Sequence, residues 1–221
     1  MTTASGLRAR SNQEAFAARL KTVAVLPVIT INRLDEAVPL AKALIAGGIK
    51  YLEITLRTPE GIKGAEKIIK EVPEAVVGLG TALTPADIKR GEDIGAQFIL
   101  SPGATPTLLK AAAESSLPFI PGVATASEIM AAMEYGFFIL KFFPATAAGG
   151  KAALSGFRGP FPDILFCPTG GINGENCAEW HALPNVITVG GSWLTPKKDI
   201  ESGNWSAITD LARKACEAIK L

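Results

Sequence analysis

The chain has 221 residues, of which 48% are hydrophobic and 19% charged, and its formal net charge is +1. This length suits a single α/β barrel domain, and the near-neutral charge gives no reason to expect a nucleic-acid partner. Glycine, proline or a charge interrupts every apolar run before it reaches the length of a membrane helix, so no membrane partner is expected either.

The predicted elements follow one another without a linker, so residues 1–221 are expected to form one domain. Residues 1–12 lack the apolar core of a signal peptide and are expected to be a mobile lead-in, followed by a helix at 13–20. Short β-rich runs then alternate with segments of helical periodicity, several of which begin at a Thr, Ser or Asp cap and end at Gly. The predicted strands are 23–29, 51–56, 75–80, 97–102, 118–123, 138–144, 164–171 and 186–191. The predicted helices are 34–48, 60–72, 84–96, 105–116, 125–136 and 204–221.

Eight strands that alternate with helices imply parallel β/α units, because each parallel connection needs a crossover. Two architectures fit this pattern: a closed (β/α)8 TIM barrel and an open doubly wound sheet. The strand count favours the barrel, and so does the spread of polar residues over many strand ends: Glu53, Arg57, Thr81, Ser101, Lys141, Thr169 and Ser192. We therefore expect a TIM barrel whose bottom is covered by the helix at 13–20.

One lysine lies inside an otherwise apolar run, and one strand carries its charges on a single face. Lys141 lies in "ILKFFP" at 139–144, where a buried amine is costly unless it is paired or neutral. In "LEITLR" at 52–57, strand alternation places Glu53, Thr55 and Arg57 on one face and the aliphatic residues on the other. Taken singly, Glu53 and Arg57 could form a structural ion pair, and Lys141 could extend to solvent.

Together these three residues indicate a chemistry. A barrel brings the second and sixth strands to one cavity, so Glu53, Arg57 and Lys141 can converge there. Burial and a nearby guanidinium disfavour a charged ammonium, and a neutral amine attacks a carbonyl to form an imine. Glu53 would carry protons between substrate and water, and Arg57 offers two parallel donors to a carboxylate. The set predicts a lysine aldolase that acts on a 2-oxo acid.

Paired glycines follow the last two predicted strands. Gly170 and Gly171 lie in "CPTGGI", and Gly190 and Gly191 precede Ser192 in "VGGSW". Barrels often bind phosphate at this place through backbone N–H groups, and glycine permits the close approach. One Gly-Gly pair is usually only a turn, but two in adjacent loops with a hydroxyl predict an anion site.

A metal-dependent mechanism has little support. The only histidine, His181, is spaced i, i+4 from Cys177, and two ligands are too few for a catalytic metal. We expect no metal and no cofactor. The three cysteines are also too sparse for a disulfide framework, so a cytoplasmic location is expected.

Six motifs, taken in order, resemble the 2-keto-3-deoxy-6-phosphogluconate (KDPG) aldolase family: "LEITLRT", "GLGTALT", "SPGAT", "KFFPA", "CPTGGI" and "VGGSWL". The likeness runs from about Val25 to the C-terminus. It implies a class I, Schiff-base aldolase on a (β/α)8 barrel, usually a homotrimer, in the Entner–Doudoroff pathway. The implied reaction cleaves 2-dehydro-3-deoxy-6-phosphogluconate to pyruvate and D-glyceraldehyde 3-phosphate, and many members also cleave 4-hydroxy-2-oxoglutarate to pyruvate and glyoxylate.

The resemblance also implies roles for individual residues. Lys141 resembles the Schiff-base lysine, Glu53 the proton-transfer residue and Arg57 the clamp on the pyruvyl carboxylate. The other implied contacts are Thr81 and Pro102 at the carboxylate end, Thr169 near the C4 hydroxyl, and Gly170, Gly171, Gly190, Gly191 and Ser192 at the 6-phosphate. The segments "ATAAGG" (145–150) and "NCAEWHALPN" (176–185) are not typical of the family.

Two other functions remain open at this point. A phosphosugar isomerase or synthase on the same barrel would keep the glycines but would not need a buried lysine on the sixth strand. A non-catalytic oligomeric barrel would need none of the three charged residues, and their joint presence counts against it.

Overall fold

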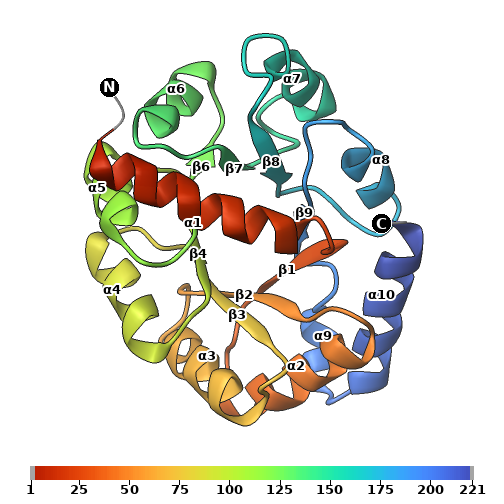
Figure 1. Ribbon diagram of the computed structural model, residues 1–221. Coiled ribbons are helices and arrows are strands. Elements are labelled where there is room, and N and C mark those ends of the chain that lie inside the picture. Colours follow the sequence, from red (N-terminus) through yellow and green to blue (C-terminus); the bar gives the residue numbers. More distant parts are fainter. Residues whose placement is uncertain (1–2, 220–221) are drawn as a thin grey trace.

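The computed structural model describes residues 3–219, and Figure 1 shows its strands gathered at the centre with helices around them. The strands are β1 (Val25–Ile29), β2 (Tyr51–Thr55), β3 (Val76–Gly80), β4 (Phe98–Leu100), β5 (Phe119–Ile120), β6 (Gly122–Val123), β7 (Ile139–Phe142), β8 (Leu165–Pro168) and β9 (Val189–Gly191). The longer helices are α1 (Ala4–Leu20), α2 (Ala37–Ala46), α3 (Glu60–Glu71), α4 (Pro85–Ile94), α5 (Pro106–Glu114), α6 (Ala126–Glu134), α7 (Gly150–Phe157) and α10 (Trp205–Ala218). The short ones are a 3-10 helix (Leu34–Glu36), α8 (Cys177–His181) and α9 (Lys197–Glu201).

The first helix is longer than the sequence predicted. Residues 4–12, expected to be a mobile lead-in, are helical and continue directly into the predicted helix at 13–20. The reason is a cap that the sequence analysis overlooked: the N–H of Gly6 donates to the hydroxyl of Thr3 at 3.1 Å. Residues 1 and 2 of the expected lead-in, and residues 220 and 221 of the predicted last helix, lie outside the described residues. Figure 1 shows α1 lying across the strands.

The strands form a parallel, curled sheet, and every ladder between them is parallel. Six strands pair in the order β5-β4-β3-β2-β1-β9, and three pair in the order β6-β7-β8. Two isolated parallel bridges, Phe166 with Val186 and Thr169 with Gly190, connect β8 to the segment that contains β9. The α/β class and the parallel sheet are therefore as predicted, while the ladders leave groups of six and three strands in place of one series of eight.

The gap between β5 and β6 has a local cause, since a single strand was predicted over 118–123. Pro121 separates the two pieces and has no N–H to donate to a ladder. The N–H of Gly122 donates instead to the hydroxyl of Ser101 at 3.2 Å, and the carbonyl of Pro121 accepts from the N–H of Lys141 at 2.8 Å. The segment 119–123 thus pairs with β4 through β5 and with β7 through β6. This change of partner within a few residues places β7 beside the six-stranded sheet.

Apolar side chains fill the interior beneath α1. This inner cluster consists of Phe16, Ala17, Leu20, Val23, Leu26, Phe98, Leu100, Ile120, Ile139, Cys167 and Ile187. A larger cluster lies between the strands and the surrounding helices. Because the inner cluster occupies the end of the strands near α1, the polar residues that follow along the strands lie toward the opposite, carboxyl end. None of the helices in residues 3–219 is long and apolar enough to cross a membrane.

Candidate active site

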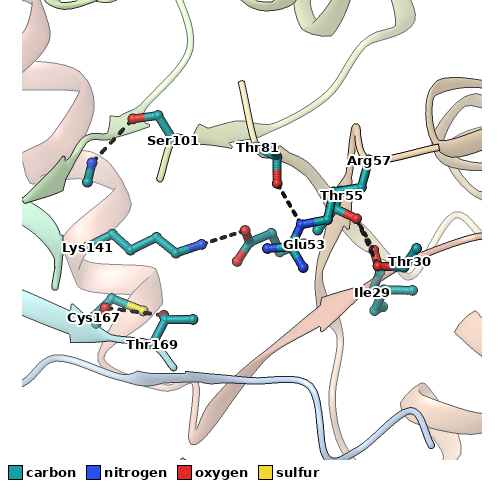
Figure 2. A network of polar contacts seen from close by, with 11 residues as sticks. Ile29, Thr30, Glu53, Thr55, Arg57, Thr81, Ser101, Lys141, Cys167 and Thr169 are labelled. Carbon is teal, nitrogen blue, oxygen red and sulfur yellow. Dashed lines mark hydrogen bonds and ion pairs between the residues drawn. The ribbon is translucent and has the colours of Figure 1, made fainter. Parts of the chain in front are cut away.

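The centre of the candidate site is a buried ion pair between two strands. Lys141 lies on β7 and Glu53 on β2, and the Lys141 Nζ donates to the Glu53 Oε1 at 2.8 Å. The side chains are only 4% and 1% exposed. Figure 2 shows the lysine extending toward the carboxylate from the opposite side of the interior. A charged pair this deeply buried is costly to maintain for stability alone, which favours a chemical role.

Glycine at position 80 makes room for the carboxylate. A Cβ on Gly80, at the end of β3, would lie 2.2 Å from the Glu53 Oε1, so any other residue would displace the acid. The second oxygen of Glu53, Oε2, is buried and has no hydrogen-bond partner within the described part of the chain. An unpaired carboxylate oxygen in a buried position is free to exchange a proton with a bound molecule.

Arg57 lies in the turn after β2 and is held by one neighbour. Its Nε donates to the hydroxyl of Thr81 at 3.2 Å, as Figure 2 shows. Thr81 has a φ of +62°, a left-handed conformation that is rare for a β-branched residue and costs backbone strain. Because Thr81 binds only the Nε, the terminal nitrogens of Arg57 keep their donors available for an anion.

A cavity of about 100 Å³ lies next to Arg57 at the carboxyl ends of β8 and β9. Its lining consists of Val28, Arg57, Phe143, Thr169, Gly170, Gly171, Ile172, Gly191 and Ser192. Gly170 and Gly171 have φ values of +105° and +79°, which only glycine adopts readily. The two predicted glycine loops and the predicted clamp therefore share one cavity.

Five predicted site residues do not line this cavity: Lys141, Glu53, Thr81, Pro102 and Gly190. Thr81 contacts it through Arg57, and a Cβ on Gly190 would meet the Thr169 hydroxyl at 2.1 Å, so Gly190 makes room for Thr169. Pro102 follows β4 and packs against Gly122, where a Cβ would lie 2.3 Å from the Pro102 carbonyl carbon.

Three lining residues had no role in the sequence analysis: Val28, Phe143 and Ile172. Phe143 had a usable signal, because it lies two residues after Lys141, and its ring centroid is 5.6 Å from the Lys141 Nζ. Val28 and Ile172 are ordinary aliphatic residues, and their composition gives no such signal.

Cys167 is inert at neutral pH, and Cys177 and His181 lie apart from the Lys141–Glu53 pair. Burial raises the pKa of the Cys167 thiol to about 12, with a smaller opposing effect of the Lys141 ammonium, so the thiol stays protonated at neutral pH. Cys177 and His181 both lie on α8, and burial lowers the pKa of His181. Within residues 3–219, no group of three or more His, Cys, Asp or Glu side chains is placed to hold a metal ion.

Comparison with known proteins gives consistent matches over nearly the whole chain. A family model for KDPG and KHG aldolase matches residues 16–211. The KHG/KDPG aldolase of Escherichia coli strain K12 is 50% identical over 202 residues, which cover 91% of this chain and 95% of that protein.

Two solved structures are also similar. The KDPG aldolase of Legionella pneumophila, with pyruvate captured as a covalent carbinolamine intermediate, has 48% identity and a TM-score of 0.88 over 90% of this chain and 97% of that one. The 2-keto-3-deoxy-6-phosphogluconate aldolase of Zymomonas mobilis ZM4, with 3-phosphoglycerate, has 37% identity and a TM-score of 0.84 over 92% of this chain and 98% of that one.

Proposed function

The chain belongs to the KDPG and KHG aldolase family, and we propose that it cleaves 2-dehydro-3-deoxy-6-phosphogluconate to pyruvate and D-glyceraldehyde 3-phosphate through a Schiff base on Lys141. It is a carbon–carbon lyase, and this reaction gives it a place in the Entner–Doudoroff pathway. The observation that carries the proposal is the buried contact between the Lys141 amine and the Glu53 carboxylate.

The first half of the reaction joins the substrate to Lys141. Transfer of a proton from the ammonium to Glu53, 2.8 Å away, leaves a neutral amine that attacks the C2 carbonyl carbon. The carbinolamine that forms loses water after Glu53 returns a proton to its hydroxyl, and a protonated imine results. The apolar interior around the pair excludes bulk water, which keeps these proton transfers between fixed partners.

The second half breaks the C3–C4 bond. Glu53, once more a carboxylate, accepts the C4 hydroxyl proton, and the C3–C4 bonding electrons move toward the imine, so that the aldehyde product leaves and an enamine remains. Glu53 then protonates the enamine at C3, and one water hydrolyses the imine to release pyruvate. Thr169, 5% exposed and part of the cavity lining, is the proposed neighbour of the C4 hydroxyl.

The two ends of the substrate would be held by different groups. We assign the carboxylate to Arg57, with Thr81 and Pro102 at the same end, and the 6-phosphate to Gly170, Gly171, Gly190, Gly191 and Ser192. The shared cavity of Arg57 and the glycine loops supports this assignment. The similar Zymomonas mobilis protein, whose structure contains 3-phosphoglycerate, supports a ligand that carries both a carboxylate and a phosphate.

The same machinery suits a second substrate, 4-hydroxy-2-oxoglutarate, which would give pyruvate and glyoxylate. This substrate has the same 2-oxo acid end for Lys141 and Arg57, and the similar Escherichia coli protein is a KHG/KDPG aldolase. An isomerase or synthase would have no use for the buried Lys141–Glu53 pair, so we prefer a lyase to these two alternatives.

For the fold, we propose one (β/α)8 barrel domain in which β5 and β6 are two halves of one strand. The single residue between them and the two bridges beside β9 support this proposal. The homotrimer and the cytoplasmic location remain predictions from the family resemblance and from the sparse cysteines.

The function is tested by following pyruvate release with lactate dehydrogenase and NADH. The purified chain should release pyruvate from the phosphorylated substrate and, at a lower kcat/KM, from 4-hydroxy-2-oxoglutarate. A folded Lys141→Met variant should release none above background from either substrate. A wild-type chain that produces no pyruvate from the phosphorylated substrate would contradict the proposal.

A further inference from the structure

Three side chains hold backbone carbonyls of the two glycine loops from outside the cavity. The Thr146 hydroxyl donates to the Gly170 carbonyl at 3.1 Å, and the Asn176 Nδ2 donates to the Gly171 carbonyl at 3.2 Å. These two residues lie in the segments 145–150 and 176–185, to which the sequence analysis assigned no role.

The third contact repeats this arrangement on the other loop. The Thr195 hydroxyl donates to the Ser192 carbonyl at 3.3 Å, and the Thr195 N–H donates to the same oxygen at 3.2 Å. Likewise, the Thr146 N–H donates to the Gly170 carbonyl at 3.1 Å, in parallel with the hydroxyl of the same residue. Each threonine therefore holds one carbonyl oxygen with two donors.

Fixing these carbonyls also fixes three N–H groups. In a planar trans peptide the C=O and the following N–H point in opposite directions. The N–H groups of Gly171, Ile172 and Trp193 must therefore point away from Thr146, Asn176 and Thr195, respectively. None of these three N–H groups donates to an acceptor within residues 3–219.

The space around Gly171 shows how closely this arrangement is packed. A Cβ on Gly171 would lie 2.2 Å from the Thr146 hydroxyl, so the hydroxyl can reach the neighbouring carbonyl only because position 171 is a glycine. Asn176 is itself held in place, because its Oδ1 accepts from the N–H of Asn173 at 2.9 Å. The loop is thus fixed by contacts that no substrate provides.

We propose that Thr146, Asn176 and Thr195 are positioning residues that orient the loop N–H groups toward the cavity and so set the preference for a phosphorylated substrate. The inference rests on the proposed function, since it concerns the same anion site. Without these side chains the Gly170 and Ser192 carbonyls keep only their backbone donors, and the Gly171 carbonyl loses its side-chain donor. The loop N–H groups are then held less firmly toward the phosphate.

The test compares the ratio of kcat/KM for the phosphorylated substrate to kcat/KM for 4-hydroxy-2-oxoglutarate. Thr146→Val, Thr195→Val and Asn176→Ala should each lower this ratio about two- to tenfold, the effect of one lost hydrogen bond. The loss should appear in KM for the phosphorylated substrate and not in its kcat, because the contact is made equally before and during reaction. Inorganic phosphate should also become a weaker competitive inhibitor of each variant.

Two control variants separate positioning from folding. Thr146→Ser keeps the hydroxyl and should keep the wild-type ratio, while Thr107→Val makes the same change as Thr146→Val at an exposed position on α5 and should have no effect. Folding is checked by circular dichroism and thermal unfolding. If folded Thr146→Val and Thr195→Val enzymes both keep the wild-type ratio, the positioning role is overturned while the aldolase assignment stands. If the wild type itself does not cleave the phosphorylated substrate, the proposed function fails first.

Discussion

Strand β7 contacts two buried polar side chains that differ in their hydrogen bonding. The side chain at the amino end of the strand has all of its hydrogen bonds, and the one that β7 contacts two residues further on does not. The first is Gln13, on α1, which is fully buried. Its Nε2 donates to the carbonyls of Phe119 and Ile139 at 2.6 and 2.8 Å. Its Oε1 accepts from the N–H groups of Phe138 and Ile139 at 2.7 and 2.8 Å.

The second side chain is Glu53, which Lys141 contacts through one oxygen while the other has no partner in the described part of the chain. Both side chains are polar and fully buried, yet only Gln13 satisfies its whole hydrogen-bonding capacity within the protein. Burial alone therefore does not separate a structural residue from the proposed proton-transfer residue, and the unsatisfied oxygen is what distinguishes Glu53 from Gln13. Removing Gln13 should therefore damage the fold, and removing Glu53 should damage the reaction.

The largest expected effect is the loss of kcat when Glu53 is replaced. Glu53→Gln keeps the shape of the side chain but cannot exchange a proton, so kcat should fall by roughly 10²–10⁴-fold. Stopped-flow and steady-state assays of pyruvate release measure this change. A variant that stays within threefold of the wild-type kcat would place Glu53 with Gln13, as a structural residue.

The second largest expected effect is the loss of stability when Gln13 is replaced. Gln13→Leu leaves backbone groups of Phe119, Phe138 and Ile139 without these partners, at about 1–3 kcal/mol for each buried group, so the free energy of unfolding should fall by several kcal/mol. Urea unfolding followed by circular dichroism measures it. The kcat of the folded fraction should change little, and a loss comparable to that of Glu53→Gln would remove the distinction between the two ends.

A matched variant sharpens the comparison. Replacing the whole pair, as Lys141→Met with Glu53→Met, removes two buried charges together without leaving an unpaired polar group, so the free energy of unfolding should equal or exceed that of the wild type. The same unfolding experiment measures this value beside that of Gln13→Leu. A double variant less stable than Gln13→Leu would mean that the ion pair is retained for the fold.

The smallest effect concerns Cys167, which pairs in register with Lys141 on the neighbouring strand. Because burial raises the pKa of this thiol from 9.0 to about 12, iodoacetamide at pH 8 should label Cys216, which is half-buried, before Cys167. The raised pKa favours the folded state fully below about pH 9, and this contribution is lost as the pH rises toward 12. Peptide mapping after brief labelling decides the order, and early labelling of Cys167 would show a thiolate at the site.

Much of the fold and the buried Lys141–Glu53 pair could be predicted because their signals are local. Alternation along 51–56 put Glu53 on the inner face, and a lysine in an apolar strand is unusual enough to single out Lys141. All eight predicted strands are found, and the one divided strand follows from Pro121, whose missing N–H has its effect only through partners elsewhere in the sheet.

The remaining features depend on contacts between distant parts of the chain. Gln13 lies among other polar residues of α1, and its partners are backbone groups more than 100 residues away, so no periodicity marks it. Gly80 was only the last residue of the predicted strand 75–80, although its lack of a Cβ is what makes room for Glu53. The helices at 150–157, 177–181 and 197–201 were not predicted, because segments of five to eight residues are too short for a clear helical period.

The central claim is that Lys141 is the nucleophile, and reductive trapping tests it most directly. The purified chain is treated with borohydride in the presence and absence of pyruvate, and the protein and its peptides are then weighed by mass spectrometry. We predict loss of activity and a single reduced three-carbon adduct, located on Lys141 and formed only with pyruvate present. An adduct on another lysine, or full activity with no adduct, would contradict the account.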